Sequence, residues 1–139
     1  MTAAVSPAAS STGRAAVWAG RALGALPAIA LALSGSMKLA HAAPMVSGLV
    51  GKLGYPDPVV ARLGVLEIVC AALYVIPQTS FVGALLVTGY LGGAIASHVR
   101  VGEPFGSPLA LGVLVWIGFW LRERRLRALA PIRQRSEAS

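Results

Sequence analysis

Residues 68–99 form a run in which no Lys, Arg, Asp or Glu occurs. Its one polar break is the segment 77–80, of sequence Pro-Gln-Thr-Ser, so we expect two apolar helices joined by a tight turn. A helix needs about 20 apolar residues to cross a hydrocarbon layer of about 30 Å. The run therefore predicts two membrane-spanning helices, and the chain is expected to be an integral membrane protein.

Apolar segments on either side of this run predict two more membrane helices. Pro27 lies within the first, and membrane helices tolerate proline because neighbouring groups compensate for the lost backbone hydrogen bond. In 43–57, apolar residues recur at helical spacing, and Asp57 resembles an N-cap with Pro58 at the first helical position. The predicted spans are 16–39, 58–76, 80–98 and 108–121. We therefore predict an all-α fold, a four-helix transmembrane bundle with a short interfacial helix between helices 1 and 2.

The segments that flank the predicted membrane domain, residues 16–121, differ from it in composition. Residues 1–15 are mostly Ala, Ser, Thr and Gly, and are expected to form a disordered cytoplasmic N-terminal tail. Residues 122–139 are expected to form an Arg-rich cytoplasmic C-terminal tail.

A secretory signal is an alternative interpretation of the N-terminal part. Arg14 and Arg21 precede an apolar stretch, and residues 40–42, Ala-His-Ala, resemble a cleavage site before Ala43. We favour the uncleaved chain because Lys38 lies between the apolar stretch and that site. Cleavage would leave three helices and place the two chain ends on opposite sides of the membrane.

The distribution of positive charge predicts the orientation in the membrane. Only 12% of the residues are charged, against about 25% in soluble domains, and the net charge is +7. Four crossings place both ends on one side, which carries more Lys and Arg and is therefore predicted to be cytoplasmic. That side holds Arg14, Arg21, Arg122, Arg124, Arg125, Arg127, Arg133 and Arg135; the opposite side holds Lys38, Lys52, Arg62 and Arg100. Because the arginine cluster directly follows an apolar helix, we expect it to face anionic lipid and not nucleic acid.

Several kinds of chemistry are excluded or disfavoured by residue counts. Cys70 is the only cysteine, so the chain forms no internal disulfide and no CxxC redox pair. Two histidines without a clear third ligand are too few for a zinc site, so we expect no metal. No Gly-rich phosphate loop, Ser-His-Asp order or carboxylate pair is present, and no self-sufficient catalytic constellation emerges from the sequence.

Glu67 is the residue that most strongly indicates a site. An acidic side chain within a membrane helix costs at least ~2.5 kcal/mol, so it should face the bundle and have a partner. The first helix offers a stripe of polar residues at helical spacing, and the end of the third helix brings two more to the same outer end of the bundle. The candidates for ligand binding or proton exchange are Ser34, Lys38, His41, Glu67, His98 and Arg100. The alternative is a purely structural Lys38–Glu67 pair that fixes the helix register.

The third predicted helix also carries small residues at a spacing of four. Gly89, Gly93 and Ser97 follow this spacing, which lets two helices approach closely. We favour packing within the bundle for this face, and a homodimer interface is the alternative.

Short motifs distributed along residues 23–122 resemble the DoxX-like family of small four-helix integral membrane proteins. They are Ser-Gly-Ser-Met-Lys-Leu at 34–39, Gly-Tyr-Pro at 54–56, Leu-Gly-Val-Leu-Glu at 63–67, Gly-Ala-Leu-Leu at 83–86, Tyr-Leu-Gly-Gly-Ala-Ile-Ala at 90–96 and His-Val-Arg-Val-Gly at 98–102. Among the candidate residues, Lys38, Glu67 and His98 occupy the recurrent polar positions of that family.

The resemblance implies a multi-pass protein of the cell inner (plasma) membrane that is an accessory or quinone-associated component of membrane redox metabolism. A quinone is then the expected ligand, and redox subunits of a membrane complex are the expected partners beside the lipid bilayer. Two alternatives stay open: a non-redox binding or transport module for a small hydrophobic molecule, and a scaffold subunit. No enzyme activity is assigned from the resemblance.

Overall fold

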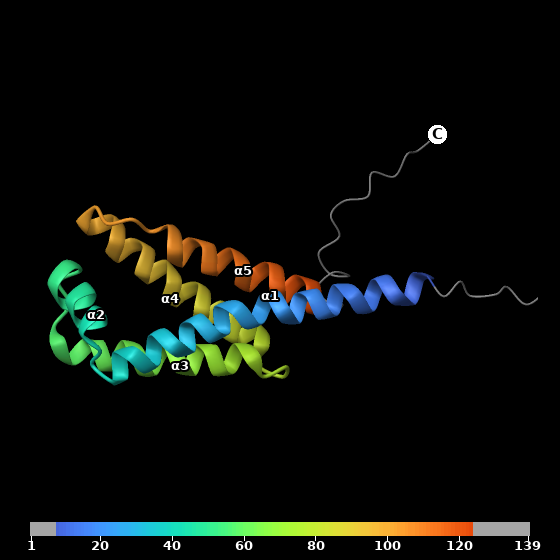
Figure 1. Ribbon diagram of the computed structural model, residues 1–139, viewed down its shortest axis with the longest axis horizontal. Helices are drawn as coiled ribbons and strands as arrows, with labels where there is room; N and C mark the ends of the chain where they lie inside the picture. Colours follow the sequence, from blue (N-terminus) through green and yellow to red (C-terminus); the bar gives the residue numbers. More distant parts are fainter. Residues whose placement is uncertain (1–7, 124–139) are drawn as a thin grey trace, which may run out of the picture.

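The computed structural model describes residues 8–123, and within that range the chain is entirely helical, without a strand (Figure 1). The elements are α1 (Ala8–Leu39), α2 (Ala43–Val46), the π-helical segment η1 (Ser47–Lys52), α3 (Asp57–Val75), α4 (Ser80–Val101) and α5 (Gly106–Arg122). The all-α prediction is confirmed, and a short helical segment lies between the first two long helices. Of the predicted tails, 1–15 and 122–139, residues 1–7 and 124–139 lie outside the described residues, and with them the arginines from 124 onward.

Two predicted helix starts need correction. Helix α1 begins at Ala8, so residues 8–15, which we assigned to a disordered tail, are helical. Asp57 is the first residue of α3 and not its N-cap; that position is taken by Pro56, and no side chain caps the helix. Gly54, with a φ of 72°, turns the chain just before α3, in a region of backbone space that favours glycine.

Within residues 8–123, three helices are long and apolar enough to cross a membrane. They are α3, α4 and the greater part of α1, Val17–Leu39. Helix α5 is apolar but has 17 residues, the lower end of the usual range for a span. Many large apolar side chains on these helices point outward, among them Leu33, Val69 and Val82, each about half exposed or more. A surface of this kind fits a hydrocarbon surrounding and would be unusual in water.

The four long helices pack as a ring. α1 contacts α3 and α5, and α4 contacts the same two helices from the other side. We call the end that carries the 76–79 turn between α3 and α4 the turn end, and the other the loop end. At the turn end the packing is close: a Cβ on Gly118 of α5 would lie 2.6 Å from the backbone nitrogen of Gly24 in α1. A Cβ on Gly83 of α4 would lie 2.2 Å from the backbone nitrogen of Tyr74 in α3.

Tyr74 anchors the core near this end. Its side chain is fully buried, and its hydroxyl donates a hydrogen bond of 3.0 Å to the carbonyl oxygen of Val115 in α5. The guanidinium of Arg122 donates to the Tyr74 carbonyl oxygen at 2.8 Å and lies 4.5 Å from the centre of its ring. These contacts tie α3 to α5 at the turn end.

Toward the loop end, α3 and α4 diverge from the turn that joins them, and the α2–η1 segment lies at the wide end (Figure 1). Arg100 at the end of α4 donates a hydrogen bond to the carbonyl oxygen of Leu53, just after η1. Tyr55 and Ser97 are joined by a hydrogen bond of 2.6 Å between their hydroxyl oxygens. The segment that follows η1 is therefore fastened to α4, and a space is left between the helices.

Candidate functional site

A cavity of about 590 Å³ occupies the space between the diverging helices. Its walls come from α1, α3, α4 and α5, and Leu49, Leu53 and Tyr55 close the loop end. The lining is mostly apolar, with leucines from every wall and alanines from α1 and α4. The polar lining residues are Ser34, Lys38, Tyr55, Glu67, Tyr90, Ser97, His98 and Ser107, together with the thiol of Cys70.

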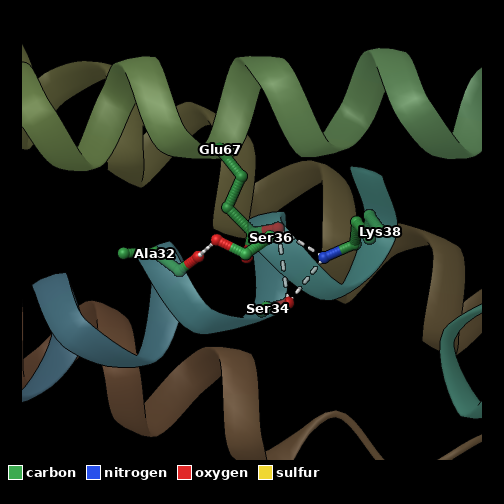
Figure 2. Close-up of polar contacts among 5 residues, drawn as sticks. All are labelled: Ala32, Ser34, Ser36, Lys38 and Glu67. Atoms are coloured by element: carbon green, nitrogen blue, oxygen red, sulfur yellow. Dashed lines mark hydrogen bonds and ion pairs between the residues drawn. The ribbon is translucent and has the colours of Figure 1, made fainter. Parts of the chain in front are cut away.

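A cluster of three polar side chains lies at the wall between α1 and α3. The Lys38 ammonium donates to the Ser34 hydroxyl at 2.6 Å and forms an ion pair with the Glu67 carboxylate. Ser34 in turn donates to the same carboxylate oxygen, at 3.3 Å. Figure 2 shows these three contacts as a triangle, in which each group interacts with the other two. We refer to Ser34, Lys38 and Glu67 as the polar cluster.

The local helical sequence explains how the cluster forms. Ser34 and Lys38 are four residues apart on α1, so they lie one above the other on the same face. Close approach of α1 and α3 brings Glu67 to this face, because a Cβ on Gly64 would lie 2.7 Å from the carbonyl oxygen of Gly35. Ser36, between them in sequence, is exposed on another face, and its hydroxyl donates to the carbonyl oxygen of Ala32 at 2.7 Å (Figure 2).

Lys38 and Glu67 of the polar cluster are buried and depend on each other as ion-pair partners. Lys38 and Glu67 are 6% and 3% exposed, and an isolated charge at such a place within a membrane would be strongly unfavourable. In the ion pair the two opposite charges offset each other. It nevertheless lines the cavity, so its remaining hydrogen-bonding capacity faces a space that a ligand can enter.

Tyr90 of α4 faces the polar cluster from the opposite wall. Its ring centre is 6.0 Å from the Lys38 nitrogen, and its hydroxyl approaches the Glu67 carboxylate. Tyr90 is not among the site residues predicted from the sequence. A signal was present, because Tyr90 lies eight residues before His98 on the same helix and thus shares its face.

The other three predicted site residues lie outside the polar cluster. His98 lines the cavity, and its Nδ1 is 2.8 Å from the carbonyl oxygen of Ala94. Arg100 is directed to the Leu53 carbonyl oxygen, as described above. His41 is exposed, with its Nε2 3.4 Å from Oδ2 of Asp57, and does not line the cavity.

A smaller cavity of about 270 Å³ extends beneath α2 and η1 at the loop end. It shares Lys38, Leu49, Leu53 and His98 with the larger cavity, so these residues form the wall common to both. Lys52 and Glu103 line it as well, with 3.5 Å between their charged nitrogen and oxygen atoms. Lys38 therefore borders both the apolar cavity and a space at the polar end of the bundle.

The small-residue face of α4 is open in the single chain. Gly89 and Gly93 are exposed, and a Cβ at either would have no atom within 4 Å. Close helix packing uses other glycines, namely Gly20, Gly24, Gly35, Gly64, Gly83 and Gly118. Gly89, Gly93 and Ser97 line the large cavity instead.

Comparison with known proteins gives a family but no individual relative. The family model described as DoxX-like matches residues 22–119, which include every wall of the cavity. No curated protein and no solved structure matches the chain. With this match over most of its length, and with three long apolar helices, the chain belongs to the DoxX-like family and is a multi-pass integral membrane protein.

Proposed function

We propose that this protein binds a small hydrophobic molecule with a hydrogen-bonding head group inside the membrane, and that a membrane quinone is this ligand. The observation that carries the proposal is the polar cluster at the wall of an otherwise apolar cavity of about 590 Å³. Ligand sites typically have volumes of about 300–1,000 Å³, apolar walls and a few polar groups that fix orientation. Binding a quinone would make the protein an accessory component of membrane redox metabolism.

The chemistry of the cluster matches a quinone head group. A quinone carbonyl accepts hydrogen bonds, and the Lys38 ammonium and the Ser34 and Tyr90 hydroxyls are donors that line the cavity. Glu67 and His98 are groups able to exchange protons with a bound head group. The apolar walls suit the ring and the tail.

We further propose that the chain crosses the plasma membrane four times, with α5 as the fourth span and both termini in the cytoplasm. The start of α1 and the end of α5 both lie toward the turn end, which carries Arg14, Arg21 and Arg122. Lys38 adds little to the opposite count because it is buried against Glu67. The cavity would then lie in the outer half of the membrane.

A matched pair of serine substitutions tests the proposed site. Ser34→Ala removes a hydroxyl of the polar cluster, whereas Ser36→Ala removes one that bonds only to the backbone of its own helix. We expect decylubiquinone to bind the purified protein in nanodiscs about tenfold more weakly after Ser34→Ala, since a lost hydrogen bond costs about 1–1.5 kcal/mol. Ser36→Ala should bind like the wild type.

Mass spectrometry of the gently solubilised protein identifies the natural occupant and any partner. A copurified quinone, or redox subunits arriving with the chain, would support the proposal. A non-redox lipid with a carbonyl or hydroxyl head would favour a binding or transport module, because the same donors would serve that head group. A bare chain that fails to bind decylubiquinone would contradict the proposal and favour a scaffold role, as a homodimer or within a larger complex.

A further inference from the structure

One wall of the large cavity is open toward the side of the bundle. Leu66 on α3 and Leu85 and Leu86 on α4 line the cavity and are each exposed by more than 40%. The cavity-lining leucines contributed by α1, α5 and the η1 region are buried or half-buried. The exposed apolar lining therefore lies along the gap between α3 and α4.

Two glycines keep this gap wide. Gly89 and Gly93 line the cavity, are exposed, and have open space where a side chain would begin. At the turn end of the same helix pair, Gly83 lies against the backbone of Tyr74, so the gap closes there. α3 and α4 thus form a wedge that is shut at the turn end and open beside Gly89 and Gly93 (Figure 1). We call this opening the lateral portal.

We propose that the lateral portal admits the ligand from the lipid phase, and that the ligand is a neutral amphiphile with a single hydrocarbon chain. This inference rests on the proposed function, because it concerns the same cavity. The head group would lie at the polar cluster, whose two charges offset each other, and the hydrocarbon chain would leave between α3 and α4, past Gly89 and Gly93, into the bilayer. An aliphatic chain needs only apolar contacts along Leu66, Leu85 and Leu86.

The single cysteine offers a reporter for this route that needs no knowledge of the natural ligand. Cys70 lines the cavity on α3, is 2% exposed, and is the only cysteine of the sequence. N-dodecylmaleimide is itself a neutral single-chain amphiphile with a carbonyl head, and it partitions into bilayers. We expect it to alkylate Cys70 of the full chain in liposomes much faster than a charged, membrane-impermeant maleimide does.

Bulky side chains at the rim should close the portal. Gly89→Phe and Gly93→Phe should each slow alkylation by N-dodecylmaleimide about tenfold, because a side chain that must move aside adds to the barrier. Gly92→Phe is the matched control: Gly92 is exposed and has nothing within 4 Å, but it does not line the cavity. That variant should label like the wild type.

The remaining outcomes separate this inference from the proposed function. Equal labelling of all three phenylalanine variants, faster labelling by the charged reagent, or a wild-type Cys70 that labels only after denaturation would overturn the lateral portal. Protection of Cys70 by decylubiquinone would support the quinone, and protection by diacylglycerol to the same degree would overturn the single-chain restriction. If decylubiquinone gives no protection while the rim variants still slow labelling, the portal stands and the quinone proposal fails.

Discussion

At the scale of single residues, the Lys38–Glu67 pair combines a structural contact with a proposed role in binding, and the two can be separated by experiment. Each side chain is tolerated within the membrane because the other neutralises it, so the pair stabilises the α1–α3 contact as a unit. The same two groups, with Ser34, are the polar end of the cavity. A structural role depends on the two charges being matched, whereas a binding role depends on the polar groups being present.

Removing one charge should therefore harm the protein more than removing both. We expect Lys38→Met to destabilise the fold by about 3–5 kcal/mol, because it leaves Glu67 buried without its partner. The double variant with Glu67→Met should regain most of that stability, since apolar pairs often replace buried ion pairs at little cost. Thermal unfolding in one detergent measures both, and decylubiquinone binding should be absent from the double variant.

The exposed pair at the loop end provides the control. Lys52 is 65% exposed and its nitrogen lies 3.5 Å from a carboxylate oxygen of Glu103, so Lys52→Met should cost less than about 1 kcal/mol. The double variant of the buried pair could instead be stable and bind decylubiquinone as tightly as the wild type. Lys38 and Glu67 would then stabilise the fold and take no part in binding.

At the scale of helices, the apolar runs and their breakers located the four long helices, apart from the start of α1. The predicted spans 80–98 and 108–121 match α4 and α5 to within three residues, because Pro, Gly and polar residues stop apolar helices at definite places. The sequence did not predict which face of each helix packs against which neighbour. A spacing of four between small residues shows that a helix can be approached closely, but the partner depends on crossing angles that only the assembled bundle fixes.

Glycines in close helix contact and glycines beside the cavity should respond oppositely to the same substitution. A Cβ on Gly118 would lie 2.6 Å from the Gly24 nitrogen, so Gly118→Ala must push α5 away from α1 and should cost about 1–3 kcal/mol. Gly89→Ala meets open space and should be neutral or stabilising by up to about 1 kcal/mol, since alanine favours helix. Midpoints of thermal unfolding compare the two, and equal effects would contradict the packing described here.

At the scale of the whole molecule, the four long helices pack closely at the turn end, and α3 and α4 diverge toward the loop end. The sequence predicted a partner for Glu67 among the polar residues of the first helix, and Ser34, Lys38 and Glu67 do meet. Tyr55 and Tyr90 were not anticipated as cavity residues, because helical periodicity gives the face of a helix but not the distance between helices. The α2–η1 segment, which determines where Arg100 is bonded, has an irregular path that no short-range pattern specifies.

Single cysteines at the two ends of the bundle test the proposed orientation. In a Cys70→Ala background, Pro104→Cys places a thiol in the loop between α4 and α5, and Gln78→Cys places one in the α3–α4 turn; both positions are exposed. With four crossings and cytoplasmic termini, the loop end faces outward, so an impermeant maleimide added to intact cells should label Pro104→Cys alone. Gln78→Cys should label only after the cells are permeabilised, which also shows that the thiol itself is reactive. The reverse labelling pattern would mean that the loop end faces the cytoplasm and that the cavity lies in the inner half of the membrane. The basic residues at the turn end would then face outward, against the positive-inside rule.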